Sequence, residues 1–278
     1  MKLALRPLLA VTLYLCGWYV AAQQEVYYDQ FDWGFRTGNP GDLNTGFWSS
    51  TRKRMNYLPD SGDGDLSGIV QLSGDGGQVA RVASRRLTGL IPSNNYEWYA
   101  RVRLSRFDDS AGERNAEIAF RSQNDFGYML TLDGGNDEIR LRRQGLDFDD
   151  LTTPVLRMIS PGEEYFMWGS AEGDGPVRLR ARVATDRTFS AESIVAEFDW
   201  EEQNYVQNGA RLQLIGYVQA GRYDFDFDYV SIGEVGYLHP EEYWDREGFT
   251  GAARANAFED GRSGWVASRS RSGGADIG

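Results

Sequence analysis

Arginines at alternate positions are the most prominent residues with binding chemistry in this chain. Apolar residues fill the positions between them, as in the run Val177 to Val183, so alternation puts the arginines on one face of a strand and the core on the other. A planar guanidinium binds a carboxylate or sulfate through two parallel hydrogen bonds. With neighbouring aromatic and acidic side chains, the candidate ligand-binding residues are Tyr99, Arg101, Arg103, Glu117, Arg121, Tyr128, Arg140 and Arg142.

These arginines have two interpretations. In one, they lie on a solvated outer sheet and pair across strands with Asp and Glu, each pair contributing about 0.2 to 1 kcal/mol. In the other, they line a concave sheet face that binds an acidic polysaccharide, with sugar faces laid on Tyr99 or Tyr128. The arginines that would form this face are Arg101, Arg103, Arg121, Arg140 and Arg142.

Carboxylates gather at two places in the sequence. Residues Asp60 to Asp65 alternate acidic residues with glycines, and Ca²⁺ prefers such oxygen ligands, although the bidentate Glu of a full EF-hand loop is missing. Asp224, Asp226 and Asp228 share one side of an expected strand, where like charges repel unless calcium or an arginine ladder lies between them. A structural Ca²⁺ would use Asp60, Asp63, Asp65, Asp226 and Asp228; the alternative for the first stretch is a polar turn.

The elements that position these residues are short strands. Alternating runs are separated by Gly, Asp, Asn and Pro, which is typical of antiparallel sheets, and Asp133 to Asp137 is a strong hairpin signal. We expect an all-β, two-sheet antiparallel jelly-roll sandwich. The expected strands are 26–31, 67–72, 78–83, 97–104, 116–121, 128–132, 138–142, 165–169, 177–183, 194–198, 211–218 and 223–232.

The chain termini differ in character from this middle part. Residues 1–22 combine Lys2 and Arg6, an apolar run and the small residues Ala21 and Ala22, which predicts a signal peptide and a secreted, extracellular or periplasmic protein. The sandwich should occupy residues 25–236. Residues 237–278 are expected to be an irregular segment, either a linker or tail or the truncated start of a discoidin-like domain.

Composition limits the class of partner. The formal net charge of −12 makes nucleic acid an improbable partner, and no second apolar run long enough to cross a membrane follows the signal. The single cysteine, Cys16, lies in the signal, so we expect a mature domain without disulfides.

Two stretches resemble a known family. The opening Tyr28 to Asp32 followed by Leu43 to Trp48, and the closing Tyr223 to Ile232, resemble the first and last strands of concanavalin A-like lectin/glucanase jelly rolls. The resemblance covers about residues 25–236 and implies a fold that hosts lectins, binding modules, hydrolases and lyases alike.

Catalytic motifs of that superfamily are largely missing. The paired glutamates Glu-X-Asp-X-X-Glu have no counterpart, and the neighbours Glu163 and Glu164 would point to opposite faces of a strand. The run Tyr217 to Tyr223 resembles a strand of jelly-roll alginate lyases, but Gln219 replaces the lysine, and His239 lies beyond the last expected strand.

Three functions follow from these observations. The leading hypothesis is a secreted, non-catalytic carbohydrate-binding domain, with an acidic polysaccharide as the ligand class that the arginines suggest. A polysaccharide-degrading hydrolase or lyase on the same fold is the second. A structural or adhesive envelope protein is the third.

Overall fold

The computed structural model describes residues 25–29, 48–50, 55–59, 68–84, 87, 95–108, 112–123, 126–145, 148–203 and 211–235. Within these ranges every regular element is a strand, and the strands form two antiparallel sheets. This confirms the expected all-β, two-sheet sandwich. The predicted signal peptide and the segment 237–278 lie outside the described residues, and no described segment is a helix long and apolar enough to cross a membrane.

Sheet A contains β1 (Glu25–Asp29), β3 (Met55–Pro59), β4 (Gly68–Asp75), β6 (Tyr96–Phe107), β12 (Glu164–Glu172), β13 (Val177–Ala184), β14 (Ile194–Glu202) and β16 (Arg222–Glu234). Its strand order is β14-β13-β12-β6-β16-β4-β3, and β1 pairs with β16.

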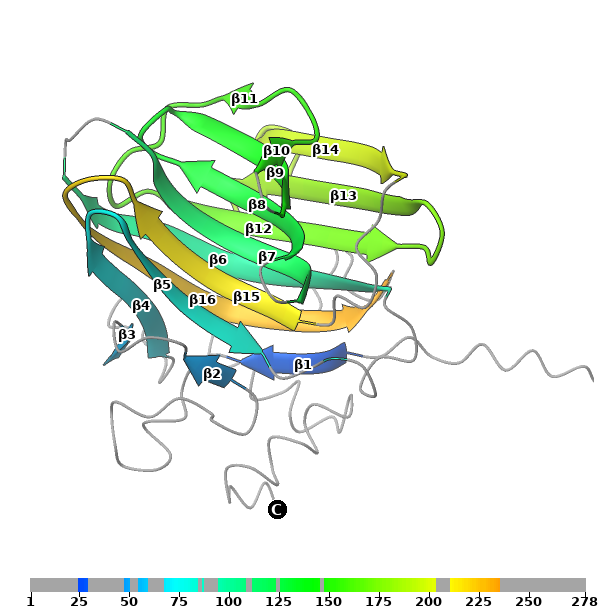
Figure 1. Ribbon diagram of the computed structural model, residues 1–278, viewed down its shortest axis with the longest axis horizontal. Coiled ribbons are helices and arrows are strands. Elements are labelled where there is room, and N and C mark those ends of the chain that lie inside the picture. Colours follow the sequence, from blue (N-terminus) through cyan, green and yellow to red (C-terminus); the bar gives the residue numbers. More distant parts are fainter. Residues whose placement is uncertain are drawn as a thin grey trace, which may run out of the picture.

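Sheet B contains β2 (Trp48–Ser50), β5 (Gln78–Ser84), β7 (Arg114–Gln123), β8 (Phe126–Asp133), β9 (Glu138–Gln144), β10 (Asp149–Asp150), β11 (Val155–Leu156) and β15 (Arg211–Val218). Its order is β10-β9-β8-β7-β15-β5-β2, and β11 pairs with β9. Figure 1 shows β5, β15, β7, β8 and β9 side by side in front of the strands of sheet A.

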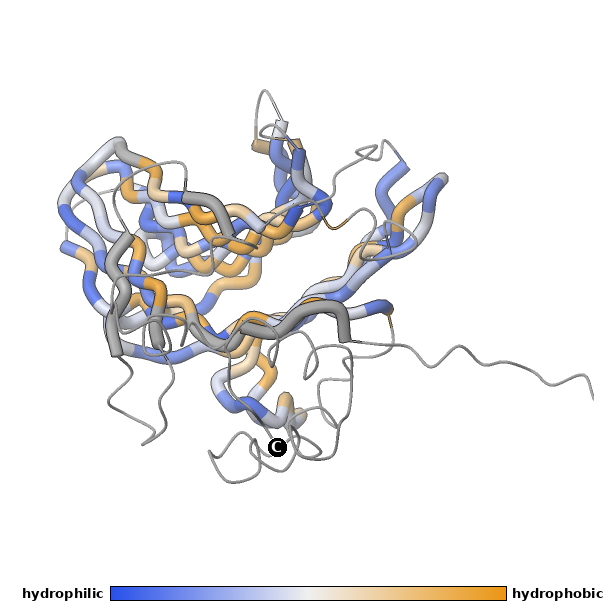
Figure 2. The backbone as a smooth tube through the Cα atoms, turned by 90° about the horizontal axis from the view of Figure 1, so that it is seen from below, coloured by the Kyte–Doolittle hydropathy of each residue, from blue (hydrophilic) through white to orange (hydrophobic). Residues whose placement is uncertain are grey.

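The core lies between the two sheets. Alternation sends apolar side chains inward from each sheet, for example Trp98 and Val102 from β6 and Ile118 and Leu130 from β7 and β8. Figure 2 shows the sheets as two layers, one over the other, with hydrophobic stretches in the middle of both. Burial of these side chains is the main stabilising contribution to the sandwich.

One tyrosine ties the two sheets together through its hydroxyl group. Tyr223 of β16 donates a hydrogen bond to the Gly216 carbonyl (2.8 Å) and accepts one from the Ala80 backbone N–H (3.1 Å), both in sheet B. A Cβ atom on Gly216 would lie 2.7 Å from the Tyr223 ring. Glycine at position 216 therefore allows the ring to pack directly against the β15 backbone.

The β8–β9 hairpin confirms the turn expected at residues 133–137. Asp133 accepts hydrogen bonds from the backbone N–H groups of Arg114, Gly135 and Asn136, at 2.9 to 3.2 Å, and from the Asn136 side chain at 2.6 Å. Asp137 has a φ of 55°, in the left-handed region that Asn and Asp tolerate better than most residues. Asp133 thereby fixes the register of the two strands that carry the candidate site.

Candidate functional site

The structure places the predicted arginines on two opposite faces of the sandwich. Ala100 and Val102 of β6 point into the core, so Arg101 and Arg103 lie on the outer face of sheet A. Ile139 and Leu141 of β9 also point into the core, so Arg140 and Arg142 lie on the outer face of sheet B. The expectation that these arginines share one face is therefore wrong, because their strands belong to different sheets.

The two candidate stacking rings, Tyr99 and Tyr128, are both fully buried. Tyr99 lies on the outer side of sheet A, where Phe189 contacts it edge-on with ring centroids 5.6 Å apart. Tyr128 lies in the core, 6.0 Å from the Phe120 ring. Stacking on a sugar needs an exposed ring face, and this structure offers none at either position.

Arg121 takes part in neither outer face but is buried at the end of the sandwich. It has a φ of 47° and lies where the β7–β8 register shifts, between Phe120 and Gln123. Its Nη2 donates to the Gly173 carbonyl at 2.7 Å, and its backbone N–H donates to the Tyr96 hydroxyl. Arg121 therefore connects β7 with the start of β6 and the β12–β13 turn, which is a structural position.

Arginines on the outer face of sheet A are paired with carboxylates. Arg103 Nη2 lies 3.0 Å from Asp226 Oδ2, and Arg106 Nη2 lies 2.8 Å from Asp224 Oδ2. The register of β16 shifts on either side of Asp226 and Asp228, so bulges account for the change of face that the sequence shows. The arginine-ladder interpretation is confirmed for Asp224 and Asp226.

The other candidate calcium ligands lie where the structure gives no side chains. Asp60, Asp63 and Asp65 lie outside the described residues, and so does the side chain of Asp228, whose backbone pairs opposite Arg101. Among the described residues no group of three or more acidic, His or Cys side chains is arranged to hold a metal ion. Calcium at Asp60 to Asp65 remains a prediction.

The outer face of sheet B brings the other predicted residues together. Backbone pairing aligns one row of side chains across five strands, from Arg81 through Ile215, Glu117 and Thr131 to Arg140. A parallel row contains Gln213, Ala119, Met129, Arg142 and Asp150, and a third contains Tyr217, Asn115, Asp133 and Glu138. Glu117 on β7 lies at the centre of this surface.

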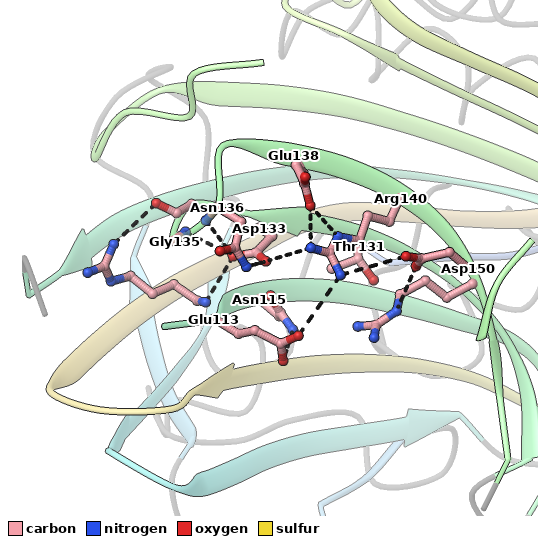
Figure 3. Close-up of polar contacts among 12 residues, drawn as sticks. Glu113, Asn115, Thr131, Asp133, Gly135, Asn136, Glu138, Arg140 and Asp150 are labelled. Carbon is pink, nitrogen blue, oxygen red and sulfur yellow. Dashed lines mark hydrogen bonds and ion pairs between the residues drawn. The ribbon is translucent and has the colours of Figure 1, made fainter. Parts of the chain in front are cut away.

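Arg140 occupies the middle of an acidic cluster on this face (Figure 3). Its Nε donates to Glu138 at 2.8 Å, and its other nitrogens lie 3.8 to 4.0 Å from Asp133, Asp150 and Glu113. Arg142 Nε lies 3.3 Å from Asp150 Oδ1. Both arginines are therefore already neutralised by carboxylates of the protein, as the cross-strand pairing interpretation expects.

Glu117 differs from these carboxylates because it is buried without an arginine beside it. The side chain is 6% exposed, and among the described residues it makes no ion pair within 4.0 Å. Within the described part of the chain, its one hydrogen bond is a long one of 3.5 Å from the Thr131 hydroxyl. Burial raises the pKa of Glu117 to about 7; Arg142 and Arg81 lower it, while Glu113 and Asp133 raise it further.

Three amides on or beside the outer face of sheet B carry oxygens that have no hydrogen-bond partner among the described residues. Asn115, Gln144 and Gln213 are each less than 5% exposed, and their side-chain oxygens are buried and unpaired. The sequence alone does not distinguish them, because amides at outward positions of a strand are common and only their burial sets these three apart.

An exposed aromatic ring borders the same face. Phe148 precedes β10 and is 53% exposed, and the Arg142 guanidinium lies over its ring, 4.9 Å from the centroid. This ring has the exposure that Tyr99 and Tyr128 lack. No strand pattern could identify it, since β10 is only two residues long.

The lyase-like run Tyr217 to Tyr223 does not form one surface. Tyr217 lies half-buried on the outer face of sheet B, opposite Asn115, whereas Tyr223 points into the core. Glu163 and Glu164 do not form a catalytic pair on one strand either, because β12 begins at Glu164. The Glu163 carboxylate accepts a hydrogen bond from the Tyr165 hydroxyl, and the Glu164 carboxylate lies 3.7 Å from the Arg103 guanidinium. His239 lies outside the described residues.

Comparison with known proteins shows similarity in fold alone. No protein-family model and no curated protein sequence matches the chain. A carbohydrate esterase from Shiga toxin-encoding bacteriophage phi24B has a TM-score of 0.50 at 9% identity, over 76% of this chain and 99% of that one. Domain 4 of a GH43 extracellular arabinanase from Geobacillus stearothermophilus has a TM-score of 0.48 at 16% identity, over 80% and 98%.

An endo-β-1,4-glucuronan lyase from the fungus Trichoderma reesei has a TM-score of 0.48 at 12% identity, over 76% of this chain and 96% of that one. Sequence identities this low indicate a similar fold and do not indicate a shared chemical function. Together with the two antiparallel sheets, the similarity to the bacteriophage esterase supports the fold expected from the sequence, a two-sheet jelly-roll sandwich.

Proposed function

We propose that this protein is a carbohydrate-binding domain that holds its ligand on the outer face of sheet B. The observation that carries the proposal is the presence of three buried amide oxygens without a hydrogen-bond partner among the described residues, those of Asn115, Gln144 and Gln213, on the same sheet face as Glu117. Leaving such a group buried without a partner costs about 1 to 3 kcal/mol. A ligand that supplies hydrogen-bond donors would satisfy these oxygens when the amide side chains turn toward it.

A sugar is the ligand class that best fits these groups. Each sugar hydroxyl can donate one hydrogen bond and accept others, so it can satisfy an amide oxygen and an arginine or amide N–H at once. The exposed Phe148 ring beside Arg142 offers an apolar surface for the C–H face of a sugar. The bacteriophage neighbour is itself a carbohydrate esterase, which agrees with a carbohydrate-related function and leaves binding and catalysis open.

Binding fits this face better than hydrolysis. A glycosidase of the usual kind needs two carboxyl groups free to act, about 5 to 9.5 Å apart. The described carboxylates of the face other than Glu117 are already engaged: Asp133 is held by the β8–β9 turn, and Glu113, Glu138 and Asp150 lie within 4.0 Å of arginines. In this proposal the domain acts outside the cell, as the predicted signal peptide implies.

Removing the unpaired amide oxygens tests the proposal. A glycan array identifies the ligand, and isothermal titration then compares wild type with the double variant Gln144→Leu, Gln213→Leu. Two lost hydrogen bonds, at about 0.5 to 1.5 kcal/mol each, weaken binding roughly 5- to 150-fold. The matched control is Gln203→Leu, an exposed glutamine just after β14 in the other sheet, which should bind as wild type does.

Two results would contradict the proposal. One is unchanged affinity in a double variant whose melting temperature shows that it is folded. The other is the absence of binding to every glycan on the array.

A further inference from the structure

Charged groups face Glu117 from several elements of sheet B and its flanks. Arg81 approaches from β5, and Arg140 and Arg142 approach from β9. Asp133 approaches from β8, Glu113 precedes β7, and Asp150 belongs to β10. Strand β15, which lies directly beside β7, contributes the uncharged Gln213, Ile215 and Tyr217.

The arginines of β9 cannot fully neutralise Glu117, because they serve other carboxylates. Arg140 lies within 4.0 Å of Glu113, Asp133, Glu138 and Asp150, and Arg142 lies 3.3 Å from Asp150. Ionised Glu117 therefore adds a buried negative charge to a face on which Arg140 and Arg142 are already paired with other carboxylates. Such a charge is costly to bury, and it repels any anion placed beside it.

Protonation removes this charge and creates a donor. A neutral carboxyl group has one O–H that can donate to a ligand oxygen, whereas a carboxylate only accepts. Since the pKa of Glu117 is raised to about 7 by burial, both forms are populated near neutral pH. The protonated form can donate a hydrogen bond to an anionic sugar, whereas the ionised form repels it. Either form can make a hydrogen bond with the hydroxyl group of an uncharged sugar.

We infer that Glu117 determines which glycan charge the outer face of sheet B accepts: an anionic glycan binds when Glu117 is protonated and is rejected when Glu117 is ionised. An uncharged glycan binds in both states. This inference rests on the proposed function and deepens it, since it names a specificity-determining residue for the same surface.

A matched pair of polymers tests the inference. Alginate is polyanionic, and its propylene glycol ester has the same backbone with most charges removed. Uronate carboxylates stay ionised from pH 6 to pH 8, because carboxyl groups ordinarily titrate near pH 4. If only the protonated form binds the anion, alginate affinity falls about tenfold from pH 6 to pH 8, in proportion to the protonated fraction. Affinity for the ester should change less than twofold.

Two variants give this experiment its controls. Glu117→Gln fixes a neutral side chain of the same shape, so alginate should bind it equally at pH 6 and pH 8. Glu201→Gln makes the same chemical change on the exposed side of β14, in the other sheet, and should keep the tenfold fall of wild type. Thermal melting of each variant at both pH values verifies that it is folded.

The outcomes separate the inference from the proposed function. Alginate binding that is equal at pH 6 and pH 8 in wild type, or absent at both, overturns the inference. Retention of the ester in the same experiment leaves the proposed function standing. Loss of binding to both polymers counts against the two together, and a tenfold fall that persists in Glu117→Gln assigns the titration to another group.

Discussion

Replacing Glu117 by glutamine should stabilise the ligand-free protein at alkaline pH. The side chain is buried on the outer face of sheet B without an ion pair to any described residue, and its pKa rises from an ordinary 4.5 to about 7. One pKa unit corresponds to about 1.4 kcal/mol, so the folded protein holds this proton about 3 kcal/mol more tightly than the unfolded chain does.

The sign of the effect follows from which state keeps the proton. Between about pH 4.5 and pH 7 the unfolded chain has released the proton and the folded protein retains it, so the free energy of unfolding of wild type falls as pH rises. Above about pH 7 both states are ionised, and the loss is complete. Glutamine stays neutral throughout and escapes this loss.

Guanidinium titrations at pH 5 and pH 8 measure the difference. Glu117→Gln should exceed wild type by roughly 3 kcal/mol at pH 8, equivalent to about 6 to 12 °C in Tm, and by less than about 1 kcal/mol at pH 5. Glu201→Gln, exposed on β14, should show no such pH-dependent gain. A Glu117→Gln protein that is no more stable than wild type at pH 8 would refute the argument, because Glu117 would then be ionised at little cost.

Further predictions concern structure and metal. Arg121→Met removes the hydrogen bond to the Gly173 carbonyl and should lower the free energy of unfolding by about 2 to 4 kcal/mol in urea titrations, whereas exposed Arg178→Met should leave the midpoint nearly unchanged. Asp133→Ala removes the acceptor of the β8–β9 turn and should cost about 2 to 4 kcal/mol, and hydrogen exchange should show faster opening of that hairpin. If Asp60 to Asp65 binds calcium, millimolar Ca²⁺ should raise the Tm relative to a chelator control, and superimposable melting curves would dismiss the site.

Alternation within strands was the most informative pattern in the sequence. It assigned Trp98 and Val102 to the core and Arg101 and Arg103 to the opposite face, and the structure confirms both. It also located the long strands, since every expected run overlaps an observed one. Short strands such as 149–150 and 155–156 contain too few residues to show an alternating pattern.

Pairing between distant strands could not be obtained from local patterns. Arg101 and Arg140 alternate in the same way, yet β6 pairs with β12 and β16, whereas β9 pairs with β8 and β10. Tyr99 alternates as a surface residue should, but Phe189, ninety positions later in the chain, covers it. The candidate site depended on such long-range contacts, so its amides and Phe148 emerged only from the structure.

The most direct test of the account is to locate a bound glycan on the molecule. Amide chemical shifts of isotope-labelled protein, recorded while the glycan selected by the array is added, should change in β7, β8, β9 and β15, with the largest changes near Glu117, Gln144 and Gln213. Changes confined to β12, β13 and β14 of sheet A would show that the ligand binds the opposite face, and would contradict the site described above.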